Sequence, residues 1–416
     1  MKKKDLINLI SLAAIHGSNA LFPLLIFPYL FLVLDAKEFS VIVVTESIAL
    51  YILAVCLYSF DISGVKAIVH CISKNDTHGL RRTYWTIFLV RMVLFTSISC
   101  FSLVCCYVFF NSYFDQMLLW LMYPLGMILQ ANYFFQATES NVKLCVMVFF
   151  SRVLASILIY TNIDHTGMGL LSTSLIAGSF LLSGVMSFSY ILYSMGAKWS
   201  YFKFGEIGSH LRGGIEIFIG NFSVALFRGS NILILSAVSN PIAVSGYSIS
   251  EKVIKSLQAL SRPMNELAFP KIVKDIGRFK GIKKPSTIVW QHTKYQIYIM
   301  LFLIPSFIGG LHLIIYFDVW TKLDGHIVNL ITIMGLAIFF GICNFMYGSA
   351  GLNTLGFHRY YAVAIAASGT VALIVSIILS YLFSDIGAAV SFVFGEAALF
   401  SLFYMKYKKI GSKKYD

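Results

Sequence analysis

The sequence consists mostly of apolar stretches that are long enough to cross a membrane. Hydrophobic residues make up 58% of the 416 positions, and charged residues only 12%, against about 25% charged residues in soluble domains. A transmembrane helix needs about 20 mostly apolar residues, and roughly twelve segments satisfy this requirement. They cover approximately residues 7–34, 38–60, 84–110, 116–137, 143–162, 168–194, 213–238, 241–262, 294–317, 327–350, 360–383 and 386–405. We therefore expect an all-α membrane protein with about twelve transmembrane helices.

Basic residues gather in alternate connections between these segments. The chain has 32 Lys and Arg against 19 Asp and Glu, a formal net charge of +13. Such an excess can indicate nucleic-acid binding, but that function needs a large solvated surface, which this composition excludes. Cytoplasmic loops retain Lys and Arg, and the basic residues at 2–4, 66–82, 198–212, 262–294 and 406–414 all fall on one side if the N-terminus is inside. The pattern predicts that both termini are cytoplasmic.

The polar segment around 198–210 separates the predicted helices into two groups of six. We expect two domains, a lobe formed by residues 1–200 and a lobe formed by residues 201–416. The stretches from Tyr29 to Lys66 and from Ile232 to Lys271 share the order of apolar helix, short turn, helix with a buried Glu and basic segment. Internal repeats of this kind favour a transporter whose two bundles rock about a central cavity. A twelve-helix bundle without repeat symmetry is the alternative.

Several cationic side chains lie at membrane depth in this arrangement. An ionisable residue at the bilayer centre costs roughly 2.5–3.5 kcal/mol, so each must face protein, water or a ligand. The candidate substrate-binding residues are Arg91, Arg152, Arg228, Lys255 and Arg262. They outnumber the buried acids, which predicts a cationic central cavity and an anionic substrate. Guanidinium groups bind phosphate through paired hydrogen bonds, so a diphosphate fits better than a cationic drug. Snorkelling to the interface is the alternative for Arg91, and an interfacial position is the alternative for Arg262.

Three acidic residues near the centres of predicted spans are candidates for ion coupling: Glu46, Glu251 and Glu396. They could take up H⁺ or Na⁺ in turn, or they could be structural carboxyl groups held by hydrogen bonds. Glu251 could also pair with Arg228 across the outer turn, either as a cavity-lining couple or as a static salt bridge. The sequence has no nucleotide-binding loop, catalytic nucleophile motif or metal-ligand spacing. We therefore expect a transporter without a cofactor, which is driven by a substrate or ion gradient, rather than an enzyme.

Five segments carry motifs that resemble those of a known transporter family. Phe134–Glu139 followed by Arg152 is similar to a family signature F-F-Q-G-x-E…R, with Ala137 in place of Gly. In the second half, Gly246–Lys252 resembles Y-x-x-A-E-K, and Gly387–Glu396 resembles G-A-A-x-S…E. Weaker matches lie at 28–39, where a Leu replaces the family's Arg, and at 60–66. These motifs are those of the bacterial polysaccharide-transport family, in particular the O-antigen repeat-unit flippases (Wzx-type), within the multidrug/oligosaccharidyl-lipid/polysaccharide exporter superfamily.

The resemblance covers nearly the whole chain and implies both a fold and a function. It implies twelve helices in two lobes about a central cavity, in a bacterial inner membrane. It also implies movement of undecaprenyl-diphosphate-linked oligosaccharide from the cytoplasmic to the outer leaflet, with a polysaccharide polymerase and a chain-length regulator as partners to be tested. A cation-coupled multidrug exporter of the same superfamily is the alternative. A membrane-embedded glycan polymerase is disfavoured, because the predicted outer loops are too short to hold catalytic groups.

Overall fold

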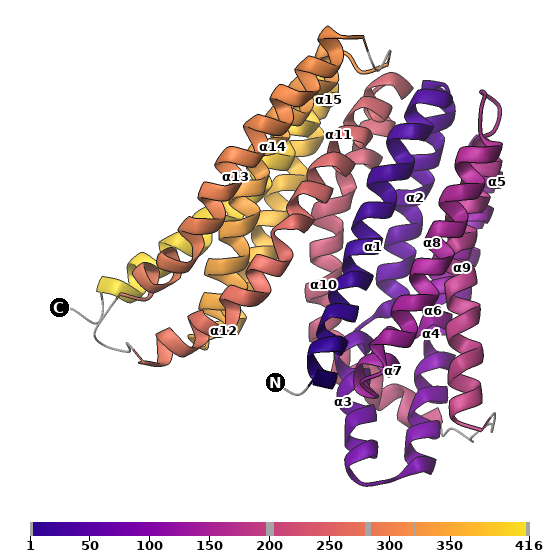
Figure 1. The fold of residues 1–416 in the computed structure, drawn as a ribbon, viewed down its shortest axis with the longest axis vertical. Helices are drawn as coiled ribbons and strands as arrows, with labels where there is room; N and C mark the ends of the chain where they lie inside the picture. Colours follow the sequence, from indigo (N-terminus) through magenta and orange to yellow (C-terminus); the bar gives the residue numbers. More distant parts are fainter. Residues whose placement is uncertain (1–2, 197–203, 279–283, 319–321, 413–416) are drawn as a thin grey trace. The chain divides into compact units, whose positions relative to one another are not determined.

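The fold was analysed in a computed structural model, which describes residues 3–196, 204–278, 284–318 and 322–412. These residues form helices joined by short turns, with no strand in the described ranges (Figure 1). The chain divides into two compact units, Met1–Ala225 and Leu226–Asp416. The domain boundary predicted at residue 200 falls in the segment 197–203, outside the described residues, and the two units divide within helix α10 instead. The domain limits of 1–200 and 201–416 therefore stay a prediction.

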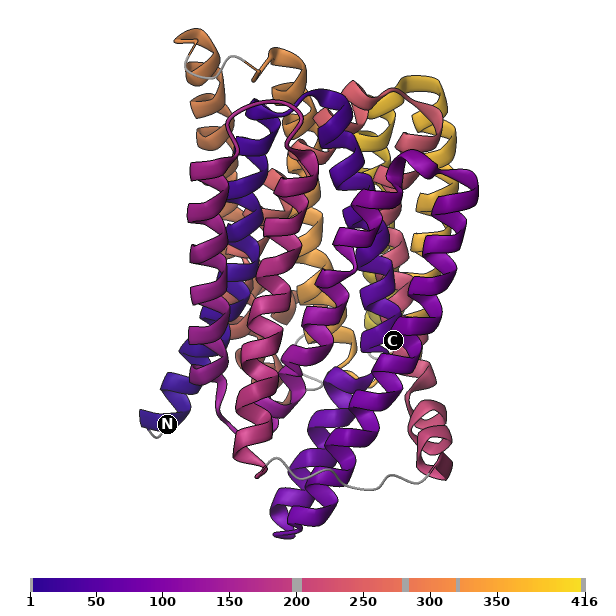
Figure 2. The same ribbon diagram turned by 90° about the vertical axis from the view of Figure 1, so that its right-hand side faces the viewer.

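The first unit is built from nine α-helices, a 3₁₀ turn and the first part of α10, in the described part of the chain. Their bounds are α1 Lys3–Val33, α2 Ala36–Leu57, α3 Phe60–Ser73, α4 Thr77–Phe109, η1 Asn111–Tyr113, α5 Phe114–Trp120, α6 Met122–Gln130, α7 Asn132–Ala137, α8 Asn141–Asn162, α9 Gly169–Ser194 and α10 Phe204–Val238. Figure 2 shows α3 and the beginning of α4 as a hairpin that extends beyond the other helices of this unit.

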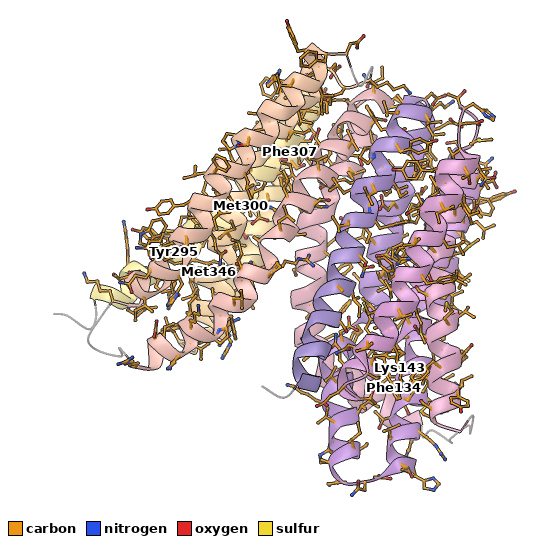
Figure 3. The ribbon with its side chains drawn as sticks, in the orientation of Figure 1. Phe134, Lys143, Tyr295, Met300, Phe307 and Met346 are labelled. Carbon is orange, nitrogen blue, oxygen red and sulfur yellow. The ribbon has the colours of Figure 1, made fainter. Side chains whose placement is uncertain are left out.

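The second unit contains the end of α10 and the helices that follow it. Their bounds are α11 Pro241–Leu260, α12 Arg262–Arg278, α13 Pro285–Tyr316, α14 Gly325–Cys343, the π-helix η2 Asn344–Leu352 and α15 His358–Ser412. The long α15 is two helices in sequence, because Ser384 has φ 52° and ψ −130°, which is not helical. Side chains fill the interior of the unit, with Met300 on α13 and Met346 on η2 both buried (Figure 3).

Eight helical segments in the described residues are long and apolar enough to span a membrane. Two shorter apolar helices, 17–33 and 229–238, contribute to the predicted first and seventh spans. Each predicted span has a helical counterpart once α15 is divided at Ser384, so the observed elements are compatible with the predicted count of twelve. The prediction of an all-α, multi-pass membrane protein is confirmed. The predicted central cavity stays a prediction.

Several helices begin at a side chain that accepts a hydrogen bond from the first turn. The carboxylate of Asp35 accepts from the backbone N–H of Glu38 at 2.7 Å, and Asn240 accepts from Ala243 at 2.9 Å. Asp76 and Asp324 cap α4 and α14 in the same way. The first turn of a helix has N–H groups without intrahelical partners, and these residues satisfy one of them. Polar residues between apolar stretches thus fix where the helices start.

The two units repeat one arrangement. In the first, α2 and α3 form a nearly continuous helical segment of 38 residues from Ala36 to Ser73, and in the second α11 and α12 run from Pro241 to Arg278. Each segment is followed by a long helix, α4 with 33 residues or α13 with 32 residues. Glu46 lies ten residues after Ala36, and Glu251 lies ten residues after Pro241. The similarity predicted between the two halves therefore extends to helix lengths and to the position of this Glu.

Helices α6 and α9 approach each other closely in the first unit. A Cβ atom added at Gly184 would overlap the backbone of Gly126, and one added at Gly126 would overlap the backbone of Phe180. Small residues at a helix–helix contact allow backbones in a membrane to pack directly. This contact places Tyr123 of α6 beside Phe180 of α9, with ring centroids 4.1 Å apart. The two glycines thereby position the side chains around Arg152.

Candidate functional site

The guanidinium of Arg152 is buried inside the first unit without an acidic partner among the described residues. Arg152 lies on α8 and is 4% exposed. Its Nη1 donates a hydrogen bond to Oγ of Ser179 at 2.7 Å, and its Cζ lies 3.5 Å from the ring centroid of Phe180 and 5.3 Å from that of Phe22. Nε and Nη2 are buried and have no hydrogen-bond partner. A cation with two open donors, held by aromatic rings, is equipped to bind an anionic group.

Tyr123 connects Arg152 with one of the predicted coupling residues. It lies close enough to both Glu46 and Arg152 for their charges to act on its hydroxyl group. Glu46 is half-buried on α2. The charges of a predicted substrate-binding cation and of a predicted coupling acid therefore act on one tyrosine within one unit. The arrangement allows a change in the charge of Glu46 to alter the electrostatic environment of Arg152.

Arg91 is buried among side chains of the first unit. It is 1% exposed, and its Nη2 forms an ion pair with Oδ1 of Asp61 at 2.9 Å. Its Cζ lies 4.8 Å from the ring centroid of Tyr133 and 5.6 Å from that of Phe60. These rings belong to the buried apolar cluster that joins α3, α4 and α7, and Phe134 of α7 belongs to it as well (Figure 3). The substrate-binding role of Arg91 and its snorkelling alternative both stay predictions.

A chain of polar contacts runs through the second unit and includes Glu251. Ser376 of α15 donates to Oδ1 of Asn231 at 2.8 Å, and Nδ2 of Asn231 donates to the hydroxyl of Tyr247 at 2.9 Å. The Tyr247 hydroxyl donates to Oε1 of Glu251 at 3.5 Å, and Lys255 Nζ lies 3.0 Å from Oε2 of the same carboxylate. Glu251 is 2% exposed, whereas the Lys255 side chain is 41% exposed. The chain joins the buried Ser376 of α15 to the exposed end of a lysine, and its carboxylate, Glu251, is the group in it that can take up a proton or balance a cation.

The other predicted residues have different surroundings. Arg228 lies on α10, but its side chain is outside the described residues, so the predicted pairing of Arg228 with Glu251 stays a prediction. Arg262 is exposed at the start of α12. Glu396 is 1% exposed, and Nδ2 of Asn344 donates to its Oε2 at 2.7 Å and to its backbone carbonyl at 2.9 Å. Glu396 therefore has an amide hydrogen bond, as expected if it is a structural carboxyl group rather than a coupling residue.

Sequence reasoning did not identify several polar residues that hold these charged groups. The missed residues are Tyr123, Ser179, Asn231, Tyr247, Asn344 and Ser376. One signal was present, because Tyr247 and Glu251 are four residues apart and such residues share a helix face. Contacts between distant segments, such as Asn231 with Ser376, have no signature in a single sequence. Among the residues that the structure describes, no group of three His, Cys, Asp or Glu could hold a metal ion.

Comparison with known proteins identifies the fold. No family model matches the chain. A solved structure described as the inward-facing conformation of a multidrug resistance MATE family transporter of the MOP superfamily aligns with a TM-score of 0.72, 13% identity and coverage of 96% of this chain and 95% of that chain. The lipid II flippase MurJ, in an inward closed conformation, aligns with a TM-score of 0.66, 14% identity and coverage of 94% and 87%. The chain has the fold of the MOP-superfamily transporters. This fold agrees with the resemblance that the sequence motifs indicated.

Curated proteins similar in sequence to this MOP-fold chain carry a common name. A protein of Escherichia coli (strain K12) named "Putative O-antigen transporter" is 23% identical over 411 residues, which is 96% of this chain and 95% of the relative. A protein of the same name from Shigella dysenteriae is 21% identical over 296 residues, which is 70% of this chain and 72% of the relative. The similarity extends over nearly the full length of the first relative, so it covers both units described above.

Proposed function

We propose that this protein is a flippase for undecaprenyl-diphosphate-linked oligosaccharide, the O-antigen repeat unit, which it moves from the cytoplasmic to the outer leaflet. The observation that carries the proposal is the buried guanidinium of Arg152, which has two open donors and no acidic partner among the described residues. A diphosphate offers acceptor oxygens to such a group. Full-length similarity to a protein named as an O-antigen transporter supports a lipid-linked glycan as the cargo.

Alternating access is the mechanism that we propose for this transport. The two units would present a site first to the cytoplasm and then to the outer side while the lipid tail remains in the bilayer. Arg152 would bind the diphosphate, and Arg91, Arg228, Lys255 and Arg262 are the further candidate contacts. Basic residues concentrated in alternate loops support an inner-membrane protein with both termini in the cytoplasm. A polymerase and a chain-length regulator are proposed partners, since a flipped repeat unit must next be polymerised.

The decisive experiment measures where the lipid-linked glycan accumulates when the gene is deleted. We expect a single complete repeat unit on the cytoplasmic leaflet and loss of the surface polysaccharide, both restored by the intact gene. Accumulation on the outer leaflet would instead indicate a polymerase. An unchanged glycan pool would contradict the proposal and favour the multidrug exporter, which is the second candidate because a drug transporter shares the fold with a TM-score of 0.72.

Glu251 is the proposed coupling residue in the second unit, and Glu46 and Glu396 are the further candidates. We expect Glu251→Gln to leave folding intact but to abolish the response of transport to an imposed H⁺ or Na⁺ gradient, because the amide cannot be protonated or balance a cation. The measurement uses the purified protein in vesicles with a labelled diphosphate-linked lipid. Tyr247→Phe should weaken the response, since it removes a hydroxyl that contacts Asn231 and Glu251.

A matched control separates coupling from a general loss of negative charge. Asp115 is exposed in the first turn of α5. Asp115→Asn makes the same change from carboxylate to amide and should leave the gradient response as it is in the unmodified protein. A Glu251→Gln protein that still responded fully to both gradients would remove Glu251 from the proposal, whatever the identity of the transported substrate.

A further inference from the structure

Matching helices of the two units each display an apolar side chain and a lysine one turn apart on an exposed face. In α3 these residues are Ile62, 46% exposed, and Lys66. In α12 they are Leu267, 70% exposed, and Lys271. Counted from the first residues of α2 and α11, the two pairs occupy the same positions. Neither lysine has an ion-pair partner among the described residues.

The two lysines lie equally far along their own helical segments. Lys66 lies 30 residues after Ala36, and Lys271 lies 30 residues after Pro241. At about 1.5 Å per residue each stretch is about 45 Å long, and a bilayer with its head groups is about 40–45 Å thick. A segment of this length that starts at one membrane surface brings its apolar residue, Ile62 or Leu267, to the edge of the hydrocarbon at the other surface. Its lysine, Lys66 or Lys271, then reaches the phosphate layer.

The remaining faces of the two helices agree with an interfacial position. Gly64 and Ile68 of α3 are buried, as are Ala268 and Ile272 of α12. The exposed face of α12 carries further cations, Lys274 and Arg278, beside Val273, which is 38% exposed. A face that mixes apolar residues with lysines is unfavourable both in hydrocarbon and in open water. It is favourable in the head-group region, where the methylene chains of the lysines contact acyl chains and their ammonium groups contact phosphates.

We propose that α3 and α12 form a repeated pair of binding sites for anionic lipid head groups, centred on Lys66 and Lys271. The ligand is a phospholipid with net negative charge, which balances two lysines that have no ion-pair partner in the part of the chain that the structure describes. Zwitterionic lipids have a phosphate but also a neighbouring cation, so they bind less favourably. This inference concerns the membrane rather than the transported substrate and does not depend on the proposed function.

Native mass spectrometry of the full-length protein released from nanodiscs tests the proposal. The nanodiscs contain phosphatidylglycerol and phosphatidylcholine in roughly equal amounts, so that anionic and zwitterionic lipids compete for the same surfaces. We expect several-fold preferential retention of phosphatidylglycerol, and loss of this preference in the K66E/K271E double variant. Equal retention of the two lipids by the unmodified protein, or an undiminished preference in K66E/K271E, would overturn the proposal.

The matched control makes the same charge change beyond the proposed site. Lys74 follows the last residue of α3, eight residues after Lys66, and is exposed. K74E should retain phosphatidylglycerol as the unmodified protein does, whereas K66E should lose part of the preference. Equal loss in K66E and K74E would show that diffuse positive charge, rather than charge at the head-group level, attracts the lipid, and would contradict the sites. K66Q/K271Q provides the same test without charge reversal if K66E/K271E does not fold.

Discussion

Replacing Arg152 with alanine is expected to abolish surface polysaccharide while the protein accumulates in the membrane at its normal level. Arg152 has no acidic partner among the described residues, and two of its buried donors are without a hydrogen bond there. Its removal therefore leaves no buried carboxylate unpaired and should not unfold the unit. Arg152→Lys should restore little activity, because an ammonium cannot stack on Phe180 and offer paired donors in the same way. Surface glycan and membrane protein level are measured in the same cells.

The control for Arg152 is Arg359, which is exposed at the start of α15. Arg359→Ala removes the same charge and should leave surface polysaccharide unchanged. Arg228→Ala and Lys255→Ala extend the test to the second unit and should also abolish the glycan if those residues contact the substrate. Normal glycan in cells that carry Arg152→Ala would contradict the proposed diphosphate contact, even if the other two variants were inactive.

Replacing Gly184 with valine is expected to destabilise the first unit strongly. The added Cβ would overlap the backbone of Gly126, and a backbone cannot move aside as a flexible side chain can. Overpacking of a tight core costs roughly 1–3 kcal/mol, and the cost here should be at or above the upper end because α6 and α9 must separate. The expected result is a several-fold lower yield of monodisperse protein and a lower Tm in detergent.

Gly178 provides the comparison on the same helix. It also lies on α9, but a Cβ added there would meet no atom within 4 Å. Gly178→Val should therefore preserve yield and Tm, since both substitutions change glycine to the same β-branched residue in the same helix. Equal stability of the two variants would mean that the α6–α9 contact does not limit folding.

The helices could be predicted from the sequence because lipid imposes one dominant constraint. Only a helix satisfies every backbone hydrogen bond of a single segment in hydrocarbon, so each apolar stretch had to be helical. The caps at Asp35 and Asn240 are local, and their positions between apolar stretches mark the starts of α2 and α11. The break at Ala131, where φ is 45°, carries no Gly or Pro and was not predicted. Tertiary packing decides such breaks.

The candidate site was predicted as a set of charges but not as a set of contacts. Arg91 and Arg152 have the same residue type and similar apolar surroundings in the sequence, yet Arg91 is paired with Asp61, and Arg152 is hydrogen-bonded to Ser179. That difference arises from α3 lying against α4 and from α9 lying against α8. A single sequence contains the charges and their depth, whereas the partner of each charge depends on which helices become neighbours.

The π-helix that follows α14 changes the angular phase of a membrane-spanning segment. A π-helix closes its hydrogen bonds over five residues instead of four, so each such turn contains more residues than an α-helical turn. Residues after Asn344 therefore point in directions that a continuous α-helix would not give them. In this phase Gly348 packs against the ring of Phe403 and Gly351 against the hydroxyl of Tyr407. Removing one residue from this segment would rotate both glycines away from α15, so its length is fixed as firmly as its composition.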